Sequence, residues 1–189
     1  MTGLYFGSFN PIHISHLVIA EYMLQYEGLD EVWFIVSPHN PLKEKSTLIN
    51  EKLRLHMVKL AIAGNKRLKA SDVEFKLPQP SYSVQTLSAL RKKYPAKQFA
   101  IIMGSDNLES IEKWKDYKSI LKNFLILVYK RSRLNELKWK KYPKIKFIEA
   151  PLLHISSTQI RKMIKEKKLV RYLLPDSVLE FIRSNRLYM

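Results

Sequence analysis

The chain of 189 residues contains no cysteine, which excludes disulfide bonds and metal sites built on thiolates. It also lacks long apolar runs, and its N-terminus shows no basic stretch followed by an apolar one. Neither a membrane span nor a signal peptide is therefore indicated, and we expect a cytoplasmic protein without a membrane partner. Because internal repeats, low-complexity tracts and linkers are also missing, we expect a single domain over residues 1–189, with a helical C-terminal part at 155–189.

Acidic residues are scarce. The chain has 33 Lys and Arg against 17 Asp and Glu, a net charge of +16, and residues 113–168 hold 17 basic and 4 acidic residues, a net charge of +13. Such a field attracts polyanions, so a basic nucleic-acid-binding module is one hypothesis and a solvated lysine surface is another. No RNA-binding pattern of interleaved aromatic residues accompanies the charge, and we therefore expect no nucleic-acid partner.

Short apolar segments bounded by turn residues alternate with longer amphipathic ones. This alternation predicts a Rossmann-like α/β fold, with an open, mostly parallel sheet and helices on both faces. The expected helices are 14–27, one that begins near Asn50, one traced by Val84, Leu87, Leu90 and Tyr94, one or two short ones after Asp106 through Leu121, and two near the C-terminus, traced by Ile160, Met163 and Ile164 and by Val178, Phe181 and Ile182. The expected strands are Gly3–Phe6, Glu31–Val36, Leu68–Ala70 with Val73–Phe75, Gln98–Met103, Phe124–Tyr129 and Lys146–Glu149.

Ligands of such sheets bind beyond the carboxyl ends of the strands. After the first expected strand the sequence reads GSFNPIHISH, in which Gly7 allows a close backbone approach and the following helix N-terminus favours an anion. His13 and His16 are three residues apart on one helix face, so both can point at one phosphate. In the alternative, one histidine caps the helix and the other is a surface residue. A zinc site is disfavoured because no third ligand is evident nearby.

Three other segments follow strands or begin a helix. Lys43 lies in the stiff loop SPHNPLK, where its ammonium could meet a phosphate, although loops often carry a lysine. Gly104 and Asp106 suit a sugar or base contact, and Trp114 either stacks on a planar ring or packs in the core. ISSTQIR contains three hydroxyl residues, whereas a helix N-cap needs only one hydroxyl. The other hydroxyls and Arg161 therefore form a second candidate anion site.

Taken in order, GSFNPIHISH, SPHNPLK, SYSVQTL, GSDNLESIEKW and ISSTQIR resemble the HxGH-type nucleotidyltransferase superfamily, and within it the bacterial nicotinate-nucleotide adenylyltransferases. The resemblance runs from residue 3 to the C-terminal LPDSVLEFIRSNRLY and so covers nearly the whole chain. It implies transfer of the adenylyl group of ATP to nicotinate mononucleotide, giving deamido-NAD and pyrophosphate in NAD biosynthesis. Mg²⁺ would be carried on the ATP phosphates, with no metal ligands from the protein.

The resemblance also implies roles for individual residues. Catalytic roles would fall on His13, His16, Lys43 and Arg161. ATP would contact Gly7, Ser8, Phe9, His13, His16, Gly104, Asp106, Ser156, Ser157, Thr158 and Arg161. Nicotinate mononucleotide would contact Asn10, Lys43, Thr86, Asp106, Trp114 and Tyr117. Within the same superfamily, phosphopantetheine adenylyltransferase of coenzyme A biosynthesis is the alternative, although Trp114 has no evident task there. The sequence leaves a homo-oligomer open.

The chain departs from the family pattern at Ser15, where HxGH has glycine. The added hydroxymethyl group could crowd a phosphate that lies against the backbone, while a helical position accepts serine without strain. We therefore predict that Ser15→Gly leaves the fold intact and holds or raises kcat/KM for adenylyl transfer, as measured by pyrophosphate release. A large loss of activity in a variant with an unchanged melting temperature would assign the serine a role of its own.

Overall fold

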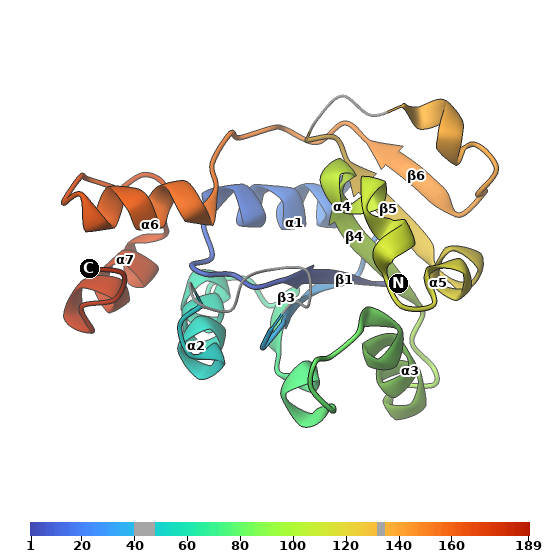
Figure 1. Ribbon diagram of the computed structural model, residues 1–189, viewed down its shortest axis with the longest axis horizontal. Coiled ribbons are helices and arrows are strands. Elements are labelled where there is room, and N and C mark those ends of the chain that lie inside the picture. The colour runs from blue at the N-terminus through green and yellow to red at the C-terminus, as the bar shows by residue number, and fades with distance from the viewer. Residues whose placement is uncertain (40–47, 132–134) are drawn as a thin grey trace.

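The computed structural model describes residues 1–39, 48–131 and 135–189. Its centre is a sheet of six parallel strands in the order β3-β2-β1-β4-β5-β6 (Figure 1). The predicted Rossmann-like fold is therefore confirmed. The strands are β1 (Thr2–Gly7), β2 (Glu31–Val36), β3 (Leu68–Ser71), β4 (Phe99–Gly104), β5 (Leu125–Tyr129) and β6 (Ile145–Ile148).

Helices connect the strands and follow the last one. Asn50 caps its helix by accepting a hydrogen bond from the Lys52 amide at 2.8 Å, and Pro95 follows the helix that ends at Lys93. None of the described helices is long and apolar enough to cross a membrane. The helices are α1 (Ile14–Tyr26), α2 (Glu51–Ile62), α3 (Ser83–Lys93), α4 (Ser105–Glu109), α5 (Tyr117–Asn123), α6 (Ser157–Lys165) and α7 (Asp176–Ser184), with the 3-10 helices η2 (Val73–Lys76), η3 (Ile111–Lys113) and η4 (Glu136–Trp139).

Helices cover both faces of the sheet, as Figure 1 shows for α1 and α3 on opposite sides. Successive strand residues alternate between two apolar clusters, because side chains in a strand point to opposite faces. Tyr5 of β1 packs with α1, α2, α6 and α7, whereas its neighbour Leu4 packs with α3, α4 and α5. The central strands are therefore buried on both sides, as parallel strands between two helical layers must be.

Two segments differ from the sequence prediction. Val73–Phe75 was expected to extend the third strand and instead lies in η2, because the pairing of β3 with β2 stops at Ser71 and the Phe75 amide donates to the Asp72 carbonyl at 2.9 Å. The polar, basic sequence of residues 132–145 predicts an exposed excursion after β5. Its η4 nevertheless packs Trp139 into the core at 2% exposure.

The strand order reverses between β1 and β4. From β1 the chain proceeds outward to β2 and β3, and then returns to place β4 on the other side of β1. The connections leave these two neighbours in opposite directions, so a crevice opens beyond their carboxyl ends. The segments after Gly7 and Gly104 face this crevice, and the fold thereby fixes where a ligand can bind.

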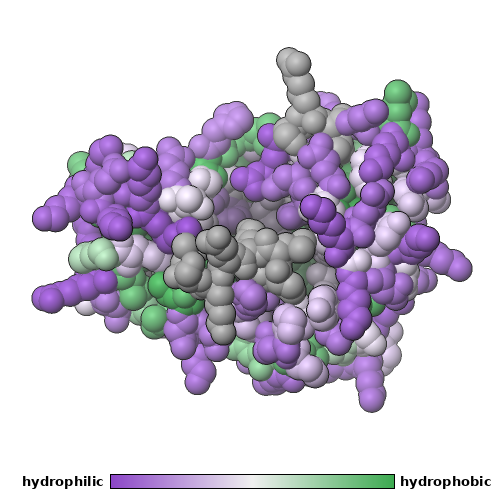
Figure 2. Space-filling view, viewed as in Figure 1, coloured by the Kyte–Doolittle hydropathy of each residue, from purple (hydrophilic) through white to green (hydrophobic). Residues whose placement is uncertain are grey.

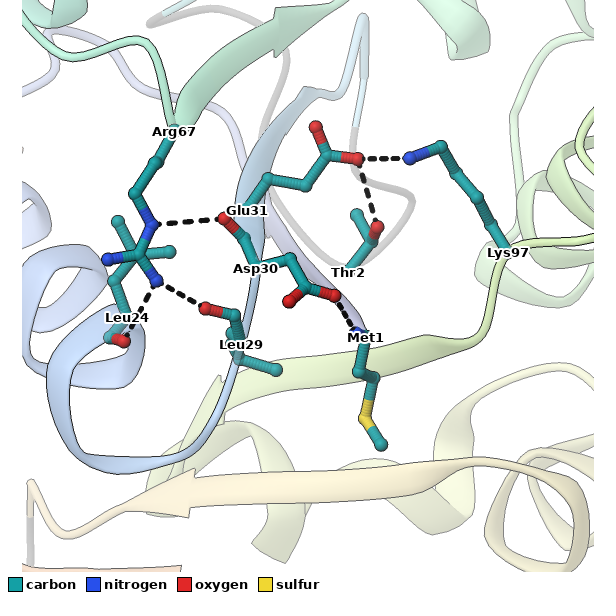
Figure 3. Close-up of polar contacts among 8 residues, drawn as sticks. All are labelled: Met1, Thr2, Leu24, Leu29, Asp30, Glu31, Arg67 and Lys97. Carbon is teal, nitrogen blue, oxygen red and sulfur yellow. Dashed lines mark hydrogen bonds and ion pairs between the residues drawn. The ribbon is translucent and has the colours of Figure 1, made fainter.

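The opposite edge, at the amino ends of the strands, is held by ion pairs (Figure 3). Glu31 is 8% exposed and accepts hydrogen bonds from Thr2 at 3.0 Å and from Lys97 at 2.5 Å, and it also pairs with Lys69. The N-terminal ammonium pairs with Asp30. These contacts join the starts of β1, β2, β3 and the segment before β4.

Burial alone would raise the pKa of Glu31, but the hydrogen bonds from Lys69, Lys97 and Thr2 outweigh it and lower the pKa to about 2. The unfolded value is about 4.3. Because the folded-state pKa is the lower one, the stabilisation is complete above about pH 4.3 and is lost as the pH falls toward 2.

We predict that Glu31→Gln lowers the free energy of unfolding by about 2 kcal/mol at pH 7, because two lysines lose their anionic partner. The variant should also lose less stability than the wild type between pH 4.3 and 2. Urea unfolding at a series of pH values measures both effects. Glu180→Gln, on the exposed side of α7, is the matched control, and equal pH dependence of wild type and Glu31→Gln would refute the assignment.

Candidate active site

The loop after β1 has a constrained backbone. Phe9 adopts a left-handed conformation with φ of 45°, which a bulky side chain rarely does. Its ring is 2% exposed and packs against Tyr5 and His16, with centroids 5.9 and 5.1 Å away. A Cβ placed on Gly7 would lie 2.7 Å from this ring. The side chain of Phe9, an expected ATP contact, thus faces the core, and only its backbone can meet a ligand.

The two histidines lie at the start of α1. His13 is the N-cap residue, and His16 accepts a hydrogen bond from the His13 amide through Nδ1 at 3.2 Å. Their rings stack with centroids 3.7 Å apart and planes 29° apart. The sequence spacing therefore does place both imidazoles on one face, and His13 occupies the N-cap position without a capping hydrogen bond from its side chain.

His13 is 4% exposed, and its Nδ1 has no hydrogen-bond partner within the described part of the chain. The amide of His16, which could have donated to it, donates to the His13 carbonyl at 3.0 Å instead. Burial, together with the charge of Arg131, lowers the pKa of His13 to about 4. The imidazole is therefore neutral at pH 7 and able to offer a hydrogen bond.

The start of α6, which carries the second candidate anion site, docks on the same loop. Ser157 Oγ donates to the Pro11 carbonyl at 2.9 Å, and Arg161 Nη1 donates to the Asn10 carbonyl at 2.8 Å. Ser156 caps α6 by accepting from the Gln159 amide at 3.1 Å. Segments about 150 residues apart are thus joined by direct hydrogen bonds.

Asn10 was expected to contact nicotinate mononucleotide. Its side chain is 3% exposed, and its Oδ1 accepts a hydrogen bond from the hydroxyl of Tyr188 at 2.8 Å. Burial raises the pKa of Tyr188, so this hydroxyl stays protonated and donates. Asn10 therefore ties the loop to the C-terminal segment, a structural task that the motif did not indicate.

Ser15 reaches a different partner from the one that its position suggested. Its Oγ lies 3.5 Å from the carbonyl of Leu153, in the segment that leads to α6. The hydroxyl is exposed and sits at the outer limit of a hydrogen bond. It is thus directed toward the chain that precedes Ser156.

The segment after β4 forms the other wall. A side chain on Gly104 would displace the carboxylate of Asp106 and the side chain of Arg131. Asp106 is half-exposed and lies 3.6 Å from the guanidinium of Arg131, and Ser105 accepts a hydrogen bond from the Arg131 amide at 2.9 Å. Asp106 thus remains accessible to a ligand at the strand end.

A cavity opens between the ends of β1 and β4, and Figure 2 shows this face of the molecule hollowed near its centre. Trp114 lines it, as expected for a residue that could stack on a ring. Thr86 and Tyr117, expected in the same pocket, are not among its lining residues. The lining residues are Phe6, Gly7, Ser8, Ser37, Glu74, Ser81, Tyr82, Ser83, Ile101, Ile102, Met103, Asn107, Lys113, Trp114 and Lys115.

Thr86 lies one turn inside α3, and this accounts for its absence from the cavity wall. It is fully buried and donates its hydroxyl to Glu74 at 2.9 Å. Ser81 donates to the second oxygen of the same carboxylate at 2.8 Å. The pair fixes Glu74, itself 2% exposed, in the wall of the cavity.

Arg54 is a residue that the sequence analysis missed. Its guanidinium is fully buried and donates to the carbonyls of Ser8 at 2.6 Å, Ser37 at 2.7 Å and Pro38 at 2.8 Å. Its Nε donates to the Ile49 carbonyl at 3.0 Å. The side chain therefore joins the loops that follow β1 and β2. The available signal was its spacing, because Arg54 is in helical register with the buried Met57, Val58 and Ile62 of α2.

Two expectations concern cations. Lys43 lies outside the described residues. Across residues 1–39, 48–131 and 135–189, no group of three or more His, Cys, Asp or Glu side chains is placed to hold a metal ion. The groups at the crevice are imidazoles, hydroxyls and a guanidinium, which match the oxygens of a phosphate.

The sequence matches the family model described as cytidylyltransferase-like over residues 4–163. A protein of Flavobacterium johnsoniae named probable nicotinate-nucleotide adenylyltransferase is 50% identical over 98% of this chain and 97% of its own length. A protein of the same name from Cytophaga hutchinsonii is 44% identical over 98% of this chain and 97% of its own length.

A solved structure of Plasmodium falciparum nicotinic acid mononucleotide adenylyltransferase complexed with NaAD has the same fold. It superimposes with a TM-score of 0.85 and 20% identity, over 99% of this chain and 96% of that one. A putative nicotinate-nucleotide adenylyltransferase from Vibrio parahaemolyticus superimposes with a TM-score of 0.73 and 17% identity, over 99% and 94% of the two chains.

We predict that Arg54→Met lowers the free energy of unfolding by about 3–5 kcal/mol, because four buried carbonyls lose a charged donor. Arg54→Lys should fall between wild type and Met, since an ammonium keeps the charge but cannot reach all four oxygens from one position. Urea unfolding measures the loss. Arg183→Met, on the exposed side of α7, is the matched control, and a loss below about 1 kcal/mol in Arg54→Met would contradict the role in joining the loops.

Proposed function

The chain belongs to the cytidylyltransferase-like family and, within it, to the nicotinate-nucleotide adenylyltransferases, and on this premise we propose that it transfers the adenylyl group of ATP to nicotinate mononucleotide. The products would be deamido-NAD and pyrophosphate, a step of NAD biosynthesis. The observation that supports this most strongly is the docking of α6 on the loop after β1. It bonds Ser157 and Arg161 to the residues that closely precede His13, and Gly7 and Ser8 of the same loop line the cavity that also contains Trp114.

We assign the ATP triphosphate to the space between the starts of α1 and α6. His13 and His16 supply imidazole hydrogen bonds from α1. The hydroxyl of Ser157 is committed to the Pro11 carbonyl, so Thr158 supplies a hydroxyl and Arg161 supplies positive charge from α6. Arg161 uses Nη1 for the Asn10 carbonyl, and its Nη2 lies 3.4 Å from Thr158 Oγ1. Its orientation is therefore fixed before a substrate arrives, which lowers the reorganisation needed for binding.

Adenylyl transfer requires that the two substrates are aligned and that the negative charge of the transition state is stabilised. The 5′-phosphate of a mononucleotide is a nucleophile at neutral pH, so it can attack the α-phosphorus of ATP without a general base, and pyrophosphate leaves in line with it. Negative charge on the reacting oxygens is met by imidazole N–H groups and by Arg161. Because His13 is neutral at pH 7, its contribution is a directed hydrogen bond, and the positive charge comes from the basic side chains.

Mg²⁺ belongs to the substrate in this proposal and enters bound to the ATP phosphates. It would draw electron density from the triphosphate and ease the departure of pyrophosphate. Side chains of the crevice would bind the remaining phosphate oxygens. We also propose that the enzyme works in the cytoplasm, where both substrates are found.

The second substrate would place its pyridine ring in the cavity beside β4. The indole of Trp114 offers a flat apolar surface on which an aromatic ring can stack. Ser8 also lines this cavity, and its Oγ is buried without a hydrogen-bond partner among the described residues. A buried hydroxyl of this kind is costly in an empty cavity and would be satisfied by a polar ligand.

The test is pyrophosphate release with ATP and Mg²⁺ and each of three acceptors: nicotinate mononucleotide, nicotinamide mononucleotide and phosphopantetheine. We predict the highest kcat/KM for nicotinate mononucleotide. His16→Ala should lower kcat about 100-fold or more, because it removes a donor to the transition-state oxygens.

His56→Ala is the matched control, since it removes an exposed imidazole on α2 and should keep wild-type kcat. Melting temperatures of both variants show whether the fold is intact. Activity confined to phosphopantetheine would overturn the proposal, and a His16→Ala enzyme as active as the control would overturn the role of the histidine.

A further inference from the structure

The cavity beside Trp114 contains three charged lining residues, Glu74, Lys113 and Lys115. With both lysines its formal charge is +1, and without them it would be −1. We propose that Lys113 and Lys115 are specificity-determining residues, which make the enzyme prefer a pyridine mononucleotide with a ring carboxylate over one with a ring amide. The inference rests on the proposed function and concerns the acceptor half of that site.

The two candidate acceptor substrates differ in charge, and charge is the property through which these lysines act. A ring carboxylate and a ring carboxamide have nearly the same size and shape, so apolar packing against Trp114 cannot separate them well. They differ by one negative charge. An ammonium within several ångströms attracts the carboxylate and leaves the amide almost unaffected, and the effect grows as water is excluded.

Glu74 places a negative charge in the cavity wall, so binding of a substrate carboxylate requires positive charges in the same wall. Its carboxylate is 2% exposed, and its two oxygens accept hydrogen bonds from Thr86 and Ser81 at 2.9 and 2.8 Å. These donors hold the negative charge in place beside the cavity. A carboxylate entering a wall with this single charge would be repelled, whereas the two ammonium groups reverse the sign of the field that it meets.

The lysines are positioned for this task by their neighbours. They flank Trp114 in sequence, where η3 ends and the chain becomes extended. Lys115 Nζ lies 4.8 Å from the centroid of the Tyr82 ring, and Tyr82 also lines the cavity. A cation–π contact of this kind keeps the ammonium at the cavity wall. Within the described chain neither lysine forms an ion pair, although Lys138 nearby is paired with Glu112 at 3.0 Å.

A different role for the same lysines makes a different prediction. Both mononucleotides carry a 5′-phosphate, so lysines that bind the phosphate would affect the two substrates equally. Lysines that bind the ring carboxylate affect nicotinate mononucleotide alone. The ratio of kcat/KM for nicotinate to that for nicotinamide mononucleotide therefore separates the two roles.

The experiment compares Lys113→Gln, Lys115→Gln and the double variant with the wild type, at saturating ATP and low ionic strength. We expect the ratio to fall roughly two- to threefold in each single variant and about five- to tenfold in the double variant, through kcat/KM for nicotinate mononucleotide. In the wild type, added salt should lower the ratio as well, and in the double variant it should do so less.

Two controls sharpen the test. Lys118→Gln removes the same charge from the exposed side of α5 without lining the cavity, and it should keep the wild-type ratio. Lys113→Arg combined with Lys115→Arg retains both charges and should keep the ratio within about twofold. Equal melting temperatures across the set show that the changes are local.

The results distinguish the two proposals. A wild-type enzyme without adenylyl transfer to nicotinate mononucleotide would overturn the proposed function and this inference together. A wild-type enzyme with that activity, whose double glutamine variant keeps the ratio or loses activity on both substrates equally, would leave the function standing and overturn the inference.

Discussion

The loop after β1 contains carbonyl groups that no regular secondary structure can satisfy, and the site depends on the side chains that supply their donors. Arg54 donates to Ser8, Arg161 donates to Asn10, and Ser157 donates to Pro11. Buried carbonyls need such partners, and each partner also fixes the direction of the backbone that it holds. Because Arg54, Arg161 and Ser157 hold these carbonyls, the histidines that follow are held in one arrangement at the crevice.

The fold could be predicted from the sequence because it follows from alternation and from residues near in sequence. The helix expected to begin near residue 50 begins at Glu51, and the strand Glu31–Val36 was predicted with its observed bounds. The meeting of the first and last motifs was implied only by the family resemblance, which assigned both of them to the phosphates of ATP. Arg54 could not be placed in the same way, because an arginine on a helix is usually solvated. Its partners are backbone atoms, which leave no mark in the sequence.

Thr86 illustrates the same limit for the cavity. Its position near the start of a helix was compatible with a ligand contact, and the choice was decided by Glu74, twelve residues earlier, which was expected in a strand. When Val73–Phe75 forms η2 instead, Glu74 turns inward and captures the hydroxyl. The family resemblance alone implied a ligand contact for Thr86, whereas the structure directs its hydroxyl to Glu74. Lys113 and Lys115 flank Trp114 in the sequence, but the path of the chain was needed to place them in one cavity lining with Glu74.

The bonds between the loop after β1 and α6 also set an order of events during synthesis. The carbonyls of Asn10 and Pro11 find their donors on residues that the ribosome adds about 150 positions later. Until then, the first strand can pair with its neighbours while the loop after it lacks the hydrogen bonds from Ser157 and Arg161. The sheet can therefore assemble before the crevice is finished, and competence to hold a triphosphate would be among the last properties that the nascent chain acquires.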